Sequence, residues 1–110
     1  RTRSLPGLGG TPRASRWARF MEGFFLSQHF PAEDFYLGIF HYTRREYTLA
    51  EARFSSAIGE SHGRYYEMYL NLGSALFRQG RNAEADACYR IVLSEDPKNR
   101  IARERLARNP

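Results

Sequence analysis

Cysteine and long apolar runs are scarce in this sequence, and each shortage excludes a class of protein. Cys88 is the only cysteine among the 110 residues, so no disulfide can form within the chain and a reducing compartment is expected. It falls on the apolar face of a predicted helix, where a small buried side chain is a better interpretation than a reactive thiol. No run reaches the roughly 18 apolar residues of a transmembrane helix. The chain is therefore expected to form one domain at most and not to span a membrane.

Residue patterns typical of catalysis or metal binding are also missing. His29, His41 and His62 lie far apart in the sequence and match none of the spacings of zinc sites. The glycines within residues 7–10 belong to a proline-containing segment with no strand before it, unlike those of a phosphate-binding loop. His41 falls at an inward helical position, where a hydrogen-bonded core or groove histidine is expected. We therefore predict no enzyme, no cofactor and no metal.

Acidic residues are absent from the first 21 positions, although arginines are frequent there. These arginines are Arg1, Arg3, Arg13, Arg16 and Arg19. The other 89 residues hold 12 basic and 12 acidic side chains, so the net charge of +5 belongs to this end. Residues 1–14, with three glycines and two prolines, are predicted to form an extended basic arm. Its composition is typical of an organellar targeting region or its remainder, so a mitochondrial location is favoured, although a flexible basic tail fits equally well.

A helix with an aromatic face is predicted for residues 15–30. The apolar positions Trp17, Phe20, Met21, Phe24 and Phe25 recur with helical spacing. A basic helix of this kind can lie on a membrane surface, which keeps a peripheral membrane contact open. Such a face more often docks onto neighbouring helices, and docking is our prediction.

The helix that follows Pro31 is apolar nearly all round. Its large apolar residues are Phe35, Tyr36, Leu37, Ile39, Phe40 and Tyr42. A helix that is apolar on every side is expected to be buried on every side. We therefore predict that it lies between the N-terminal helix and the helices that follow.

Residues 66–99 contain two amphipathic helices joined by a short turn. The first has an apolar face made of Tyr69, Leu72, Gly73, Leu76 and Phe77, and the second has one made of Ala85, Cys88, Tyr89, Val92 and Leu93. Gly80 is expected to close the first helix in a left-handed conformation, and Asn82 to cap the second. Pro97 is expected at the first position of a further helix, where its missing N–H is tolerated.

An earlier copy of this unit lies 35 residues upstream, at residues 31–64. The earlier copy departs from the later one in three places. It has Asp34 in place of a large residue at the start of the unit, Arg45 in place of the glycine at the turn, and His62 in place of the proline at the end. Thr48 and Glu51 have the spacing of a capping box, in which each side chain satisfies a backbone N–H of the other. A constant interval between two units predicts a helical repeat.

The repeated unit resembles the tetratricopeptide repeat, a helix–turn–helix of about 34 residues. The residues that carry the resemblance are Leu37, Gly38, Ala50, Phe54, Leu72, Gly73, Ala85, Tyr89 and Pro97. It implies an all-α fold, a right-handed solenoid of about six helices in one domain over residues 15–110. Residues 31–64 and 66–99 would be its repeats, and residues 97–109 a capping helix with a polar outer face.

The resemblance also implies how such a chain would act. In the family, the first helix of each repeat lines a concave groove that binds extended peptides or a partner helix. By position, the groove residues here are Phe35, Ile39, Tyr42, Leu70, Ser74, Phe77 and Arg78. Since a solenoid usually needs about three repeats, we predict a non-catalytic scaffold protein, a small accessory subunit that binds other protein subunits of a larger, organellar assembly.

RNA is the alternative partner. The last helix contains Arg100, Arg103, Arg105 and Arg108, which together with the basic arm could neutralise phosphates. The intervening Glu104 is spaced to form ion pairs with Arg100 and Arg108. Such pairs favour a polar capping helix. The alternative is a basic nucleic-acid contact, which would make the chain an RNA-associated subunit, for example of an organellar ribosome, whose binding weakens steeply with salt.

Overall fold

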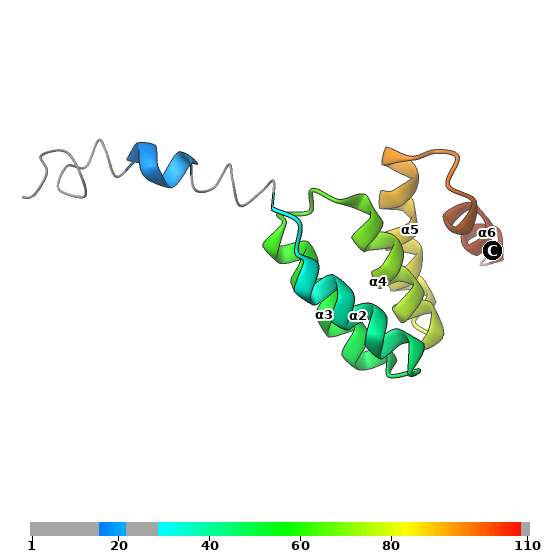
Figure 1. The fold of residues 1–110 in the computed structure, drawn as a ribbon. Coiled ribbons are helices and arrows are strands. Elements are labelled where there is room, and N and C mark those ends of the chain that lie inside the picture. Colours follow the sequence, from blue (N-terminus) through cyan, green and yellow to red (C-terminus); the bar gives the residue numbers. More distant parts are fainter. Residues whose placement is uncertain (1–15, 22–28, 109–110) are drawn as a thin grey trace, which may run out of the picture.

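The computed structural model describes residues 16–21 and 29–108, and within these ranges it contains helices and no strand. The helices are a short one over residues 16–21, α2 (Ala32–Thr43), α3 (Tyr47–Glu60), α4 (Tyr66–Arg78), α5 (Asn82–Glu95) and α6 (Arg100–Arg108). From α2 onward, each helix packs against the next one in the chain (Figure 1). The predicted all-α solenoid of helical hairpins is confirmed.

The two hairpins, α2–α3 and α4–α5, are built in the same way. In each, an aromatic ring of the second helix lies on a glycine of the first. A Cβ atom added at Gly38 would lie 2.5 Å from Cε1 of Phe54, and one added at Gly73 would lie 2.9 Å from Cε1 of Tyr89. Both rings are fully buried. The interval of 35 residues therefore relates equivalent places in the fold.

The helices pack through small side chains around these two rings. One cluster, between α4, α5 and α6, contains Leu76, Ala85, Cys88, Tyr89, Val92 and Ala102, and another, between α3 and α4, contains Ala50, Phe54 and Ala75. Cys88 is buried in the first cluster, and burial raises the pKa of its thiol to about 11. The thiol is therefore protonated at neutral pH and acts as a small apolar side chain.

The turns α2–α3, α3–α4 and α4–α5 each contain a residue in the left-handed conformation. Gly80 has a φ of 79°, and the N–H of Arg81 donates to the carbonyl of Leu76 at 3.1 Å, as expected for a helix closed by a left-handed glycine. Arg45 and His62 occupy the corresponding places with φ values of 63° and 55°. The left-handed conformation is unfavourable for side chains with a Cβ atom, so these two turns form at a cost that the third avoids.

The predicted N-caps are wrong. α3 begins one residue before Thr48, and its N-cap residue, Glu46, makes no side-chain capping hydrogen bond. Asn82 is itself the first residue of α5, and this helix also begins without a side-chain cap. The expected capping box fails because the carboxylate of Glu51 binds Arg81 instead, at 2.7 Å.

The last helix begins later than expected. Pro97 was predicted at its first position, but α6 starts at Arg100 after a short turn. Asn99 provides the cap, since its Oδ1 accepts a hydrogen bond from the N–H of Ala102 at 3.0 Å. An asparagine cap accepts a hydrogen bond from a free backbone N–H at the start of the helix, whereas a proline only removes one such N–H.

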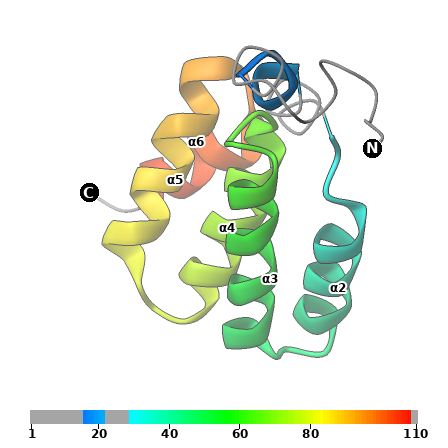
Figure 2. The same cartoon turned by 90° about the vertical axis from the view of Figure 1, so that its left-hand side faces the viewer.

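The expectation that α2 is buried on every side is wrong as well. Tyr36 is 64% exposed and Phe40 is 51% exposed, so one face of the helix is open to solvent. Trp17 and Phe20 in the short N-terminal helix are 66% and 67% exposed, and their predicted docking is not observed. Figure 2 shows that α2 and the pair α5–α6 lie on opposite sides of α3 and α4. α2 therefore forms one end of the row of helices.

Part of the predicted N-terminal region lies outside the described residues. This applies to residues 1–14, with Arg1, Arg3 and Arg13 of the predicted arm, and to Phe24 and Phe25 of the aromatic face. Arg16 and Arg19 belong to the described short helix and are exposed.

Candidate partner-binding groove

The predicted groove residues lie on α2 and α4, and the structure brings three of them together. Ile39 and Tyr42 from α2 face Ser74 from α4 across a hollow of about 250 Å³. The other residues that line it are Thr43, Phe54 and Asn71. Asn71 precedes Ser74 by three residues and shares its helix face, a spacing that could have identified it. Thr43 follows Ile39 by four residues in α2, so the same kind of spacing could have identified it too.

The remaining apolar residues of the predicted groove are held elsewhere. Phe35 packs against the α3–α4 cluster, and its ring centroid lies 5.4 Å from that of Phe30. Leu70 packs against the α4–α6 cluster. Phe77 does the same and is covered by Arg105 of α6, whose guanidinium carbon lies 4.3 Å from the centre of the Phe77 ring. These three residues support the walls of the groove and do not line the hollow.

Arg78 adds a positive charge at the rim of the hollow. Its Nε donates a hydrogen bond to the hydroxyl of Tyr42 at 3.1 Å, and its guanidinium carbon lies 6.0 Å from the centre of that ring. The Tyr42 hydroxyl raises the pKa of Arg78, so the side chain stays charged. The site thus combines aromatic and aliphatic walls, a serine, an amide and one exposed cation.

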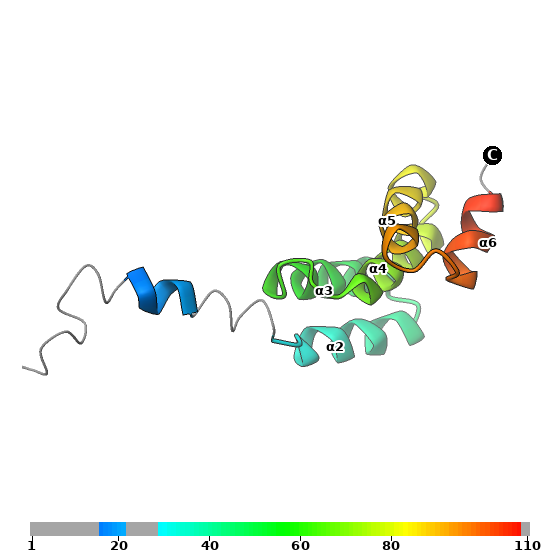
Figure 3. The same cartoon turned by 90° about the horizontal axis from the view of Figure 1, so that it is seen from above.

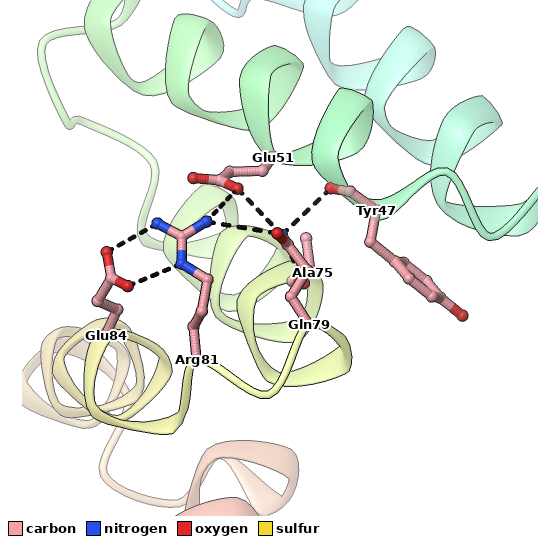
Figure 4. A network of polar contacts seen from close by, with 6 residues as sticks. All are labelled: Tyr47, Glu51, Ala75, Gln79, Arg81 and Glu84. Atoms are coloured by element: carbon pink, nitrogen blue, oxygen red, sulfur yellow. Dashed lines mark hydrogen bonds and ion pairs between the residues drawn. The ribbon is translucent and has the colours of Figure 1, made fainter.

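A polar network behind the groove joins α3 to the turn between α4 and α5 (Figure 4). Arg81 contacts Oε1 of Glu51 at 2.7 Å and both carboxylate oxygens of Glu84 at 2.8 and 2.9 Å. Gln79 donates to the same Glu51 oxygen at 3.0 Å. The hydrogen bonds from Arg81 lower the pKa of Glu84. The network therefore ties α3 of the first repeat to the second repeat.

A buried carboxylate joins the two helices of the first repeat. Asp34 accepts a hydrogen bond from Nη1 of Arg53 at 3.0 Å and one from Oγ of Ser56 at 2.8 Å. Burial raises the pKa of Asp34, but these hydrogen bonds outweigh it, and the pKa lies below its ordinary value. Asp34 corresponds to Tyr69 of the second repeat, 35 residues later. The first repeat therefore joins its two helices by hydrogen bonds at the position where the second repeat has a large aromatic side chain.

His41 is hydrogen-bonded, as predicted. Its Nδ1 lies 2.8 Å from Oε1 of Glu46, and this contact lowers the pKa of Glu46. Among residues 16–21 and 29–108, no three histidine, cysteine or acidic side chains are placed to hold a metal ion. Within the same ranges no helix has the length and apolarity needed to cross a membrane.

Cations gather on α6, away from the groove. Lys98, Arg100 and Arg103 surround an open hollow of about 450 Å³ together with Glu104 and Ala107. The predicted ion pairs of Glu104 with Arg100 and with Arg108 do not form in this described helix. Within the described residues, Arg100 and Arg108 therefore lack the ion pairs with Glu104 that their spacing predicts.

Comparison with known families agrees with this geometry. The family model for the tetratricopeptide repeat matches residues 35–100 and, in a second overlapping match, residues 70–108. Neither the comparison with curated proteins nor the one with solved structures finds a match. The matched residues span α2 to α6 and include every signature position from Leu37 to Pro97. The chain belongs to the tetratricopeptide repeat family.

Proposed function

We propose that this chain is a scaffold protein that binds a segment of another protein in the groove between α2 and α4. Tetratricopeptide repeats generally mediate protein–protein interaction and scaffolding. The observation that carries the proposal is the hollow of about 250 Å³ lined by Ile39, Tyr42, Asn71 and Ser74. It lies between the first helices of the two repeats, where this family binds its partners.

The lining of the hollow favours a partner segment of defined chemistry. Ile39, Tyr42 and the floor residue Phe54 suit an aliphatic or aromatic side chain, since binding pockets are mostly apolar with few polar groups. Asn71 can donate to and accept from the backbone of an extended segment. Arg78 at the rim suits a carboxylate next to the inserted side chain.

The role within a cell belongs to the same proposal. Two repeats are fewer than the roughly three that usually build a self-sufficient solenoid, which supports a small accessory subunit of a larger assembly. The arginine-rich, acid-poor composition of residues 1–21 supports an organelle, the mitochondrion first, as its location.

Two isoleucines of similar exposure provide a matched test of the groove. Ile39 lines the hollow and is 37% exposed, whereas Ile91 on α5 lies outside it and is 41% exposed. We expect Ile39→Asp to weaken partner binding at least about tenfold, because it puts an unpaired charge where an apolar side chain is bound. Ile91→Asp should bind as the wild type does. The measurement is quantitative recovery of cross-linked partners from native extracts with a tagged form of this chain.

The outcome can also contradict the proposal. Equal recovery with Ile39→Asp and Ile91→Asp would place the binding surface elsewhere. The second candidate is an RNA-associated subunit, which the cations Lys98, Arg100 and Arg103 around the hollow at α6 favour. Its binding would fall steeply with salt concentration, because it depends on phosphate contacts, and it would be lost in Arg100→Gln and Arg103→Gln but not in Ile39→Asp.

A further inference from the structure

α6 corresponds to the first helix of a further hairpin. It is the last helix of the described row (Figure 1), and it begins at Arg100, 34 residues after the first residue of α4. This interval is one residue shorter than the interval between the two hairpins, because the connection before α6, residues 96–99, is one residue shorter than the connection before α4, residues 61–65. At this interval Met68 of α4 corresponds to Ala102 of α6, and both residues are buried.

Two positions on the first helix of a hairpin face its second helix. In α2, Asp34 accepts hydrogen bonds from two residues of α3, and an aromatic ring of α3 lies on Gly38. In α4, an aromatic ring of α5 lies on Gly73, and Tyr69 packs against the α4–α6 cluster. The second helix of each hairpin therefore covers the face that carries these two positions.

Within the described residues, α6 presents the same face uncovered. Arg103 follows Tyr69 by 34 residues and Ala107 follows Gly73 by 34, and both residues of α6 are exposed. They border the open hollow of about 450 Å³ at α6. The hollow therefore lies where the second helix of a further hairpin would pack. Its other lining residues are Lys98, Arg100 and Glu104.

Charge decides which kind of helix fits this face. In the first hairpin, Asp34 of α2 pairs with Arg53 of α3 at 3.0 Å, so a charged residue at this position takes a partner of opposite charge from the covering helix. Arg103 reverses the sign at this position, and two further cations but only one carboxylate line the hollow with it. The complementary surface therefore carries carboxylates, whereas two copies of this face would repel each other.

The small residue on this face favours a helix as its occupant. Ala107 lets a second backbone approach α6 closely, as Gly38 and Gly73 do in the two hairpins, whereas a contact with phosphates requires no small residue. We propose that α6 binds an amphipathic helix of a partner protein, which packs where the second helix of a hairpin would lie and places carboxylates opposite Arg103. This surface is separate from the groove between α2 and α4, so it is a second binding site of the scaffold.

The sequence of α5 (Asn82–Glu95) supplies a probe, because α5 covers the same face of α4. Cys88 follows Arg53 by 35 residues and therefore holds the corresponding position in its helix. The probe is a synthetic peptide with the sequence of α5 and the substitution Cys88→Glu, and the control peptide has Cys88→Gln. Both also carry Tyr89→Leu, because the Cβ atom of Ala107 occupies space that the ring takes at Gly73.

Titration of the isotopically labelled chain with each peptide, followed by NMR, measures both the affinity and the place of binding. The glutamate peptide should shift the amide signals of α6 and bind at least about tenfold more tightly than the glutamine peptide, because the control lacks a charge-assisted hydrogen bond to Arg103. Arg103→Gln should abolish this difference. Arg90→Gln should preserve it, since Arg90 is an exposed cation of α5 outside the hollow.

Reversal of both charges is a stricter test of the same contact. The variant Arg103→Glu should bind a peptide with Cys88→Arg more tightly than the glutamate peptide, because this combination reproduces the pair of Asp34 and Arg53. An attraction that depends only on the net charge of the chain would not reverse in this way.

Three results would overturn the proposal. One is equal affinity of the wild type for the glutamate and glutamine peptides. Another is an oligouridylate that shifts the same α6 signals at a lower concentration than the glutamate peptide does, which would assign the hollow to phosphates. The third is a shift of these signals when the chain alone is concentrated, which would assign the face to a second copy. Ile39→Asp should bind both peptides as the wild type does, so this proposal and that of the groove fail independently.

Discussion

Gly38 and Gly73 decide how closely the two helices of each hairpin approach. The ring of Phe54 or Tyr89 occupies the space that a Cβ atom would need. The Tyr89 hydroxyl is buried with no hydrogen-bond partner in the described part of the chain, and Phe54, its counterpart, has no hydroxyl. Both hairpins therefore share an aromatic ring packed against a glycine. The contact with the glycine is made by the ring and not by the hydroxyl.

Replacing Gly38 by alanine should destabilise the protein by about 1–3 kcal/mol, because the added methyl carbon would lie 2.5 Å from the buried ring of Phe54, which must shift to admit it. Gly59 is the control, since it lies in α3 and a Cβ atom added there would meet nothing within 4 Å. Gly59→Ala should stabilise by up to about 1 kcal/mol through helix propensity. Urea unfolding followed by circular dichroism measures both. Midpoints that shift in the same direction would contradict this explanation.

At the scale of helices, buried and partly buried ion pairs join elements that are distant in sequence. Arg53 and Ser56 of α3 hold the carboxylate of Asp34 in α2. Glu60 is drawn into the same cluster, where the hydrogen bond with Asp34 raises the pKa of Glu60. The pKa values of the two carboxyl groups are therefore shifted in opposite directions, and Asp34 is the one held ionised by its partners.

Acid should weaken the joint between α2 and α3. Because the pKa of Asp34 in the folded state lies below its ordinary value of 3.8, ionised Asp34 stabilises the fold above that value, and this contribution is lost as the pH falls through the lowered pKa. Asp34→Asn should be less stable than the wild type at neutral pH and should lose less stability on acidification. Urea unfolding across the acidic range tests this.

The control for acidification is Glu33→Gln, which removes the neighbouring exposed carboxylate. This variant should follow the wild-type pH dependence closely, because Glu33 makes no hydrogen bond or ion pair with another described residue. A loss of stability in Asp34→Asn as large as in the wild type would show that other groups control the acid response.

At the scale of the whole molecule, packing runs from each helix to the next along the row (Figure 3). α4 packs against α3 on one side and α5 on the other, whereas α2 and α6 close the two ends of the row from α2 to α6. A protein built in this way behaves as a chain of neighbouring contacts, and its ends open most easily.

Amide hydrogen exchange should follow this order. The amides of α4 should exchange most slowly, because exposing them requires that both neighbouring helices separate. Those of α2 and α6 should exchange faster, since each is covered by its neighbour on one side only. Mass spectrometry of labelled peptides measures the rates. Equal protection of α2 and α4 would contradict this explanation.

Sequence by itself determined the helices, their pairing into hairpins and the family, because glycines and rings at an interval of 35 residues reflect contacts within one hairpin. Ile39, Tyr42 and Ser74 could be assigned to the groove because their positions follow from the same repeat. Tertiary structure alone decided which face of α2 stays open and which partners Asp34 and Glu51 take. Those contacts join side chains 19 and 30 residues apart across different helices, and no local periodicity encodes them.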